Sequence, residues 1–194
     1  MKVLLLNGSR RIKGCTFTAL SHVADALKEA GIETEIVQIG SQVLNGSLTE
    51  LVNEVHGKIK SADGLVVGSP VYFASPSGEI VSFLDRLFVS AEKDLRLKPA
   101  CAVASARRGG TTATLDVINK YFAYAEMPVV SSRYWNIVHG NSPEEVVKDE
   151  EGMQIMQILG RNMAWLLKSI EAGRNAGIAA PEQAGKVFTN FIRE

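Results

Sequence analysis

Five runs rich in apolar residues alternate with segments whose apolar residues recur at helical spacing. This alternation limits the possible folds more than any other feature of the chain. The runs cover residues 3–6, 33–39, 64–72, 100–106 and 128–138. A run that is apolar at nearly every position is typical of a strand covered on both faces, and strands separated by helices pair in parallel. The alternation predicts an α/β fold, a doubly wound five-stranded parallel sheet with helices on both faces, for which we take the common strand order 2-1-3-4-5.

The helical segments are expected at residues 17–30, 48–60, 77–91, 112–125 and 149–172. Gly31 is placed to end the first of them, and Ser77 is placed to cap the third. No repeat, low-complexity tract or linker divides the sequence. We therefore expect a single domain over residues 1–194, in which residues 149–194 form a long C-terminal helix and a polar tail.

The charge balance excludes several classes of partner. Among 194 residues, 21 Lys and Arg balance 21 Asp and Glu, so no global field favours nucleic acid or an anionic membrane. No stretch approaches the ~20 apolar residues that span a bilayer, and the N-terminus lacks the pattern of a signal peptide. The two cysteines, Cys15 and Cys101, suit a reducing compartment. We therefore expect a cytoplasmic protein.

Three loops rich in Gly, Ser, Thr, Pro and Arg follow the first, third and fourth predicted strands. They cover residues 8–16, 70–78 and 106–111. In open parallel sheets, ligands bind beyond the carboxyl ends of the strands, where the winding direction reverses. With the predicted strand order this crevice lies between the first and third strands, so we expect the three loops to meet around one ligand.

The first loop, "GSRRIKGCT", has the groups of an anion site. Its backbone amides, the Ser9 and Thr16 hydroxyls and the start of the following helix all attract negative charge. Arg10, Arg11 or Lys13 can add charge-assisted bonds to a phosphate. The loop lacks the Gly-Lys-Ser/Thr ending of a nucleoside triphosphate site and the second glycine of a dinucleotide fingerprint. The pattern favours a phosphate site, and the alternative is a polar turn that only caps a helix.

The second loop, "SPVYFASPSG", places large apolar residues where a plain turn would be polar. Val71, Tyr72 and Phe73 lie between two prolines that restrict the backbone. A rigid loop with apolar and aromatic groups suits the edge and face of a planar heterocycle. The alternative is that Tyr72 and Phe73 pack under the next helix.

The third loop, "ASARRGGTT", combines paired glycines with paired arginines. Paired glycines let backbone amides approach a ligand closely. Arg107 and Arg108 either face a second anionic molecule or are only solvated.

These loops resemble the three flavin-binding loops of the flavodoxin-like NAD(P)H-dependent FMN reductases, through "GSRRIKGCT", "SPVYFASPSGEIVSFLDR" and "ASARRGG". The resemblance covers roughly residues 1–138 and is closest to the branch that includes the iron–sulfur flavoproteins. It implies a flavodoxin-like fold, FMN as cofactor and NADPH or NADH as electron donor. It implies that a hydride passes from the nicotinamide through FMN to a quinone, a free flavin or a similar small acceptor. No side chain is then expected to be catalytic, because the cofactor carries the chemistry.

The resemblance also implies roles for individual residues in the three loops. The residues implied to hold the FMN phosphate are Ser9, Arg11, Gly14, Cys15 and Thr16. Those implied to line the isoalloxazine ring are Pro70, Val71, Tyr72 and Phe73. Those implied to approach the opposite edge of the ring are Ser105, Ala106, Arg107, Gly109 and Gly110.

The chain departs from the iron–sulfur branch in its cysteines. Where those proteins carry a compact cysteine cluster after the second strand, this chain reads "SQVLNGSLTELVN". Two cysteines cannot supply the four thiolates that such a cluster usually takes, so we expect no iron–sulfur cluster and no metal site. At a helix start the pKa of the Cys15 thiol could be lowered, but a small space-filling residue is the favoured interpretation.

The three histidines show no metal-like spacing. His139, at the end of the fifth predicted strand, is expected either near the flavin or a neighbouring subunit, or in a structural hydrogen bond.

The C-terminal helix, residues 149–172, has an apolar arc wider than a helix on one core requires. Ile155, Ile158 and Trp165 widen a stripe formed by methionines and leucines. Such an excess suggests subunit contact in a homodimer or homotetramer. A deeply buried helix in a monomer is the competing account.

Two alternatives to a reductase stay open, a flavodoxin-type electron carrier and a non-flavin nucleotide sensor. Carriers usually present an acidic docking surface, whereas this chain has zero net charge and arginines beside the expected site. The charge pattern therefore favours the enzyme.

Overall fold

The computed structural model, which describes residues 1–191, contains one mixed sheet. Its parallel strands are β1 (Lys2–Asn7), β2 (Glu33–Gln38), β3 (Gly64–Tyr72), β5 (Ala100–Ala106) and β6 (Ile137–His139). They lie in the order β2-β1-β3-β5-β6, and the two-residue β4 (Ser75–Pro76) pairs antiparallel with the end of β3. The predicted fold class is confirmed, because this order is the expected 2-1-3-4-5 with β4 inserted in the numbering.

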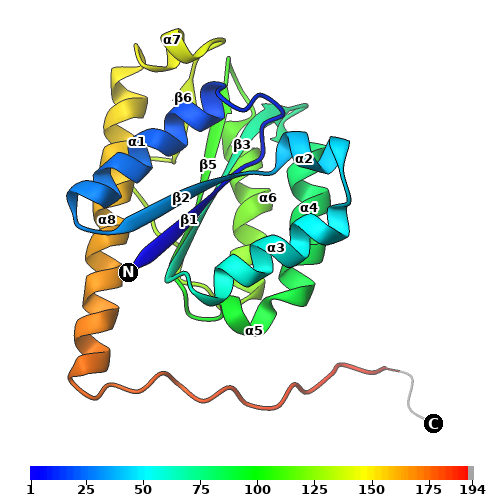
Figure 1. Ribbon diagram of the computed structural model, residues 1–194, viewed down its shortest axis with the longest axis vertical. Helices are drawn as coiled ribbons and strands as arrows, with labels where there is room; N and C mark the ends of the chain where they lie inside the picture. The colour runs from blue at the N-terminus through cyan, green and yellow to red at the C-terminus, as the bar shows by residue number, and fades with distance from the viewer. Residues whose placement is uncertain (192–194) are drawn as a thin grey trace.

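Helices cover both faces of the sheet (Figure 1). On one face, α1 (Cys15–Glu29) and α8 (Glu150–Asn175) pack on alternate strand residues such as Val3, Leu5 and Val66. On the other face, α3 (Leu48–Lys60), α4 (Gly78–Ser90) and α6 (Thr111–Tyr124) pack on the intervening residues. Strand residues point alternately to opposite faces, so runs that are apolar throughout are what this two-sided core requires.

Three short helices were not predicted, namely α2 (Gly40–Asn45), α5 (Glu92–Leu95) and α7 (Pro143–Val146). Each has six residues or fewer, which is too short for helical periodicity to appear in the sequence. The longer helices lie where they were expected, although α1 begins at Cys15 instead of residue 17.

The predicted fifth strand, residues 128–138, is wrong over most of its length. Only Ile137–His139 pairs with β5, and Val129 forms an isolated bridge to Ala100. Part of the intervening segment bonds to α8: Ser132 Oγ donates to the Ile155 carbonyl at 2.8 Å, and Asn162 Nδ2 donates to the Ser131 carbonyl at 2.8 Å. Asn136 bonds to β5, since its Nδ2 donates to the Ala102 carbonyl and its own backbone carbonyl accepts from the Ala104 amide. The segment thus has contacts on two sides without a continuous strand ladder.

Helix α8 lies on the domain's own core, as the competing account of the apolar arc described. Ile155, Met156 and Leu159 are buried against α1 and the sheet, and Ile158 is half-buried. Trp165 alone among the three residues that widen the arc is exposed, with 70% of its surface accessible. Most of the arc is therefore used within one chain.

After α8 the chain runs as an extended tail beneath the starts of the strands (Figure 1). Arg96 Nη1 donates to the Pro181 carbonyl at 3.1 Å, and the Lys186 ammonium lies 2.6 Å from a Glu92 carboxylate oxygen. Across residues 1–191, no helix has the length and apolar character needed to cross a bilayer.

Candidate functional site

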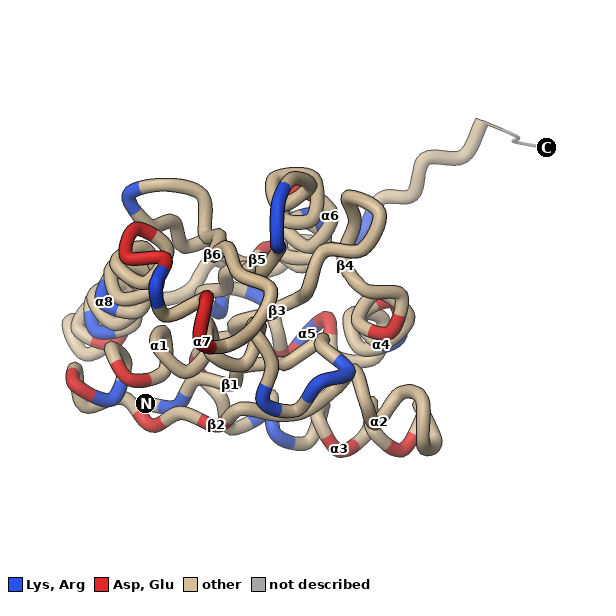
Figure 2. Tube along the Cα trace, turned by 90° about the horizontal axis from the view of Figure 1, so that it is seen from above, with Lys and Arg blue, Asp and Glu red and all other residues tan. Residues whose placement is uncertain are grey.

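The three predicted loops lie together at the carboxyl edge of the sheet, where β1, β3 and β5 end. Figure 2 looks down on this edge and shows basic segments in the loop after β1 and in the loop before α6. Because β1 and β3 are neighbours and the chain winds outward from them in opposite directions, the crevice lies where the strand order predicts.

The loop after β1 is held in one conformation by the buried side chain of Asn7 and the half-buried side chain of Gln38. Asn7 accepts a bond from the Ser9 amide at 3.1 Å and donates to Gln38 Oε1 at 2.7 Å. Gln38 Nε2 in turn donates to the Ser9 carbonyl at 2.5 Å. Sequence reasoning missed Asn7 and Gln38, since each looks like an ordinary polar residue at the end of a strand.

A second set of bonds ties this loop to the start of α4. Ser77 Oγ donates to the Gly8 carbonyl at 2.8 Å and accepts from the Ile80 amide, while the Ser77 amide donates to Ser69 Oγ at 2.9 Å. A Cβ at Gly8 would lie 2.8 Å from the Gly68 carbonyl oxygen, so only glycine allows this approach. The first and second loops are thus one rigid unit.

The start of α1 is open to an anion. Helices α3, α4 and α8 begin with side-chain caps, from Ser47, Ser77 and Asp149, and each has an acidic residue in its first turn. Helix α1, in contrast, has Gly14 as its N-cap residue, with no side-chain cap from the described residues and no acidic residue in its first turn. Its free amides and positive dipole end are therefore available to a phosphate.

Two buried hydroxyls flank this helix start. Ser9 is 5% exposed, and its Oγ accepts from the Arg11 amide at 3.1 Å, which leaves the hydroxyl proton to donate. Thr16 Oγ1 lies 2.8 Å from Ser105 Oγ, so one hydroxyl of that pair keeps a proton for a ligand. Thr16 and Ser105 lie in contact, and Ser9 and Gly14 belong to the same loop, which Arg11 links by bonding to Ser9 and packing beside Gly14. This donor set suits a phosphate.

The second loop is a tight hairpin with an exposed aromatic tip. The ladder pairs Tyr72 with Ser75, so Phe73 and Ala74 form a two-residue turn. Both have positive φ, 51° and 57°, the conformation of a type I′ turn, which normally takes Asn-Gly. Phe73 is fully exposed and Tyr72 is 40% exposed, so neither packs under the next helix. Strain held at an exposed aromatic is a reason to look for function there.

The third loop packs against this hairpin. Gly110 has φ of +94°, and a Cβ there would lie 2.8 Å from Val71 Cγ1 and from the Ala74 Cα atom. A side chain at Gly109 would meet nothing within 4 Å. Helix α6, like α1, starts without a side-chain cap or an acid in its first turn within the part of the chain that is described. Ser105 and Ala106 are buried, whereas Arg107 and Gly109 face solvent.

The cations at this edge divide into paired and unpaired groups. Arg10 Nε lies 3.5 Å from a Glu79 carboxylate oxygen, and its guanidinium lies 5.8 Å from the centre of the Tyr72 ring. Over residues 1–191, no ion pair is formed by the exposed residues Arg11, Lys13, Arg107 and Arg108. These four cations are therefore free of ion pairs with the described residues, although the acids Glu144 and Glu145 of α7 lie close enough to act on Cys15.

Cys15 acts as a space-filling residue, which is the interpretation that the sequence favoured. Its Sγ lies 3.7 Å from the Gly140 carbonyl, and burial raises the pKa of its thiol, outweighing the helix start and Arg11. Burial also raises the pKa of the Cys101 thiol. Cys15 therefore fills the space between α1 and the loop after β6 as a neutral thiol.

His139 faces the cap of α8. Its amide donates to Asp149 Oδ2 at 2.7 Å, and its ring Nδ1 lies 3.8 Å from the same oxygen. This is the structural contact that was weighed against a place beside the ligand.

Comparison with known proteins identifies the family. The profile described as NADPH-dependent FMN reductase matches residues 1–142. The chain belongs to the NADPH-dependent FMN reductase family. An iron–sulfur flavoprotein of Methanocaldococcus jannaschii is 29% identical over 192 residues, covering 88% of this chain and all of that protein. The predicted resemblance is confirmed, including its closeness to proteins named iron–sulfur flavoproteins.

Solved structures agree on the fold. The structure of RosB with bound 8-demethyl-8-formylriboflavin-5'-phosphate superimposes with a TM-score of 0.71 at 15% identity, covering 98% of this chain and 92% of that one. A flavodoxin, WrbA-like protein from Agrobacterium tumefaciens gives a TM-score of 0.67 at 13% identity, covering 87% and 97%. Family and fold together make this chain a flavin-dependent oxidoreductase, and the site's donor set fits the phosphate of FMN.

Proposed function

We propose that the crevice at the carboxyl edge binds one FMN per chain. Its phosphate would take bonds from the Ser9 and Thr16 hydroxyls, the amides at Gly14 to Thr16, and the Arg11 guanidinium. The isoalloxazine ring would lie against the second loop, at Pro70, Val71, Tyr72 and Phe73. The third loop, which contacts the second loop at Gly110, would approach the opposite edge of the ring through Ser105, Ala106, Arg107, Gly109 and Gly110. The open first turn of α1 beside two buried hydroxyls is the observation that carries this assignment.

We further propose that NADPH or NADH reduces the cofactor and that a quinone, a free flavin or a similar small acceptor reoxidises it. When bound, FMN supplies the chemistry by taking a hydride from the nicotinamide and passing its electrons on. The chain's own part is to hold the donor carbon close to the ring, at about 3–3.5 Å, and to keep water away from that contact.

The unpaired cations at the mouth support a nicotinamide as the donor. Arg107 and Arg108 lie beyond the proposed phosphate cradle, on the loop that packs against the aromatic hairpin. A planar molecule with phosphate groups fits such a surface, with its ring on the flavin and its phosphates on the arginines. An electron carrier without its own substrate site has no need for this arrangement.

Anaerobic stopped-flow mixing with NADPH and with NADH tests this proposal. We expect loss of the oxidised flavin absorbance within seconds with at least one nicotinamide, then its return on addition of a quinone. If one-electron donors reduce the flavin while neither nicotinamide does so on that timescale, the electron-carrier function replaces the reductase.

We propose no iron–sulfur cluster, because two cysteines on separate elements cannot provide its usual ligands. Iron and sulfide assays on anaerobically purified protein are expected to give values near zero.

The two free thiols fit action in the cytoplasm. We also propose that the chain is a homodimer or homotetramer, with a small molecule and neither nucleic acid nor a membrane as its partner.

A further inference from the structure

The last described residues of the tail carry large apolar side chains that are exposed to water. Val187 and Phe191 are each 96% exposed, and Phe188 is 77% exposed. They lie on an extended segment, residues 187–191, which we call the C-terminal arm. Three such residues within one short exposed segment are unusual for a surface that has no binding role.

An apolar groove lies on the outer side of α4 and α6. It has a volume of about 380 Å³ and is lined by Asp85, Phe88, Val89, Val117, Lys120, Tyr121 and Tyr124. We call it the α4/α6 groove. The centres of the Phe88 and Tyr121 rings lie 5.3 Å apart, and the Tyr121 hydroxyl donates to Asp85. These contacts hold the side chains at the bottom of the groove in place. Val89 is 79% exposed and Tyr124 64% exposed, which leaves two apolar walls in water.

The arm begins at the rim of this groove. The Lys186 ammonium lies 2.6 Å from Glu92 and 5.5 Å from the centre of the Tyr124 ring, and Tyr124 is itself part of the groove. From this anchor the tail runs outward, away from the body (Figure 2). A five-residue extended arm spans at most about 17 Å, which is enough to cross to a neighbouring molecule.

We propose that the α4/α6 groove is a docking site for the C-terminal arm of a second copy of this chain. Because the arm begins at the rim of the groove, a two-fold axis close to that rim would place each arm at the partner subunit's groove. Both exchanged arms would then bury aromatic side chains that one chain alone leaves in water. The exchange places the subunit contact on α4 and α6 instead of α8, and it does not rest on the flavin assignment.

Cross-linking between chains of different size tests the exchange directly. One chain carries Phe188→Cys, and a second, enlarged by a tag, carries Val89→Cys. After mixing and mild oxidation, we expect a disulfide-linked species that contains one chain of each size. The matched control Val147→Cys, at an exposed valine after α7, should give no such species, nor should Phe188→Cys with the unmodified tagged chain. Absence of the mixed species, or only intrachain bonding in a Phe188→Cys/Val89→Cys double variant, overturns the proposal.

Sedimentation measures the contribution of each side of the contact. Phe188→Asp with Phe191→Asp, and separately Val89→Asp, should each weaken self-association by roughly tenfold or more, since a buried apolar side chain contributes that much. The control Trp165→Glu, on the exposed part of α8, should leave it unchanged. A monomer for the unmodified protein contradicts the proposal. So does dissociation by Trp165→Glu while the arm variants stay associated.

Discussion

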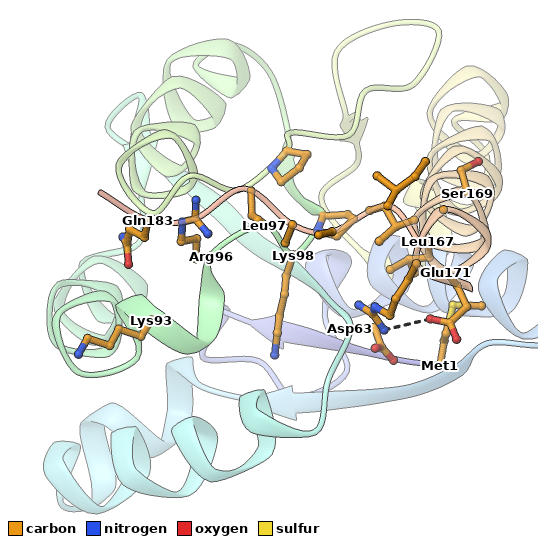
Figure 3. A pocket seen from close by; sticks show the side chains of 18 residues that line it. Met1, Asp63, Lys93, Arg96, Leu97, Lys98, Leu167, Ser169, Glu171 and Gln183 are labelled. Carbon is orange, nitrogen blue, oxygen red and sulfur yellow. Dashed lines mark hydrogen bonds and ion pairs between the residues drawn. The ribbon is translucent and has the colours of Figure 1, made fainter. Parts of the chain in front are cut away.

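The two edges of the sheet carry similar residue types, yet they differ in which groups are already bonded. A hollow of about 840 Å³ lies at the amino edge, where the strands begin, and is lined by residues such as Leu97, Lys98 and Leu167 (Figure 3). Arg96 pairs with Glu126 at 2.7 Å, Arg174 pairs with Glu171 at 3.0 Å, and the Lys98 ammonium donates to the Ile59 carbonyl at 2.6 Å. At the carboxyl edge, Arg11, Lys13, Arg107 and Arg108 form no ion pair with the described residues, and the start of α1 has no side-chain cap.

Volume is therefore a poor guide to the site in this protein. In Figure 3 the side chains of Lys93, Arg96 and Lys98 point in different directions and do not converge on one point in the hollow. The carboxyl edge instead gathers hydroxyls, amides and arginines around one helix start. A binding site is marked by several hydrogen-bond donors that have no protein partner and lie close together, as at the carboxyl edge. Within residues 1–191, the hollow at the amino edge lacks such a group of donors and is only a gap beneath the tail.

The largest effect is expected from removing both hydroxyls at the start of α1. Ser9→Ala with Thr16→Ala should weaken FMN binding about 100-fold or more, because a hydrogen bond to a charged group contributes about 1.5–3 kcal/mol. Riboflavin, which lacks the phosphate, should bind the variant and the unmodified protein alike. Fluorescence titration measures both ligands, and Ser169→Ala at the amino-edge hollow is the control. Equal losses for FMN and riboflavin would remove the phosphate role from these hydroxyls.

Residues with positive φ occur at both edges of the sheet. Replacing them at one edge or the other therefore tells an effect on stability from an effect on flavin reduction. Phe73→Asn with Ala74→Gly gives the hairpin a preferred turn sequence and should raise the free energy of unfolding by about 1–2 kcal/mol. Reduction by the nicotinamide should nevertheless slow, since the aromatic tip is lost. Urea denaturation and stopped-flow measure the two effects.

Leu97, with φ of +63° at the amino edge, provides the matched control. Leu97→Asn should leave flavin reduction unchanged. Its free energy of unfolding should rise less than that of the hairpin variant, because the half-buried Leu97 side chain loses apolar contacts. A hairpin variant that keeps full activity would show that Phe73 has no part in the reaction.

The smallest effect is expected from the arginines at the mouth. Arg107→Ala or Arg108→Ala should raise the KM for the nicotinamide about threefold to tenfold and change kcat less, because exposed contacts bind ground and transition states alike. Steady-state kinetics measure this split, with Arg174→Ala at the amino edge as the control. A fall in kcat at unchanged KM would place these arginines in a different role.

The sequence predicted most of the sheet because its strands are buried on both faces. Residues 64–72 and 100–106 form β3 and β5 as expected, and Thr16 and Ser105, from two different predicted loops, lie in contact. The aromatic hairpin could not be predicted, because Phe-Ala is not a turn sequence and its conformation depends on packing against Gly110. Asn7 and Gln38 were missed for a similar reason, since their roles depend on bonds across strands.

The segment before β6 shows where local preference failed. Its apolar and aromatic residues favour a strand, but Tyr134 and Trp135 are about half exposed and the neighbouring polar groups bond to α8. The structure of this segment depends on its tertiary contacts more than on the intrinsic β propensity of its residues, as is common because β propensity is strongly context-dependent.

Titration of the flavin-free protein with FMN and with riboflavin tests the central claim most directly. If the carboxyl edge is built around a phosphate, FMN should bind with one molecule per chain and much more tightly than riboflavin, by about 100-fold or more. The difference should shrink as inorganic phosphate is added. Equal affinities for the two flavins, or no binding of FMN, would contradict the account.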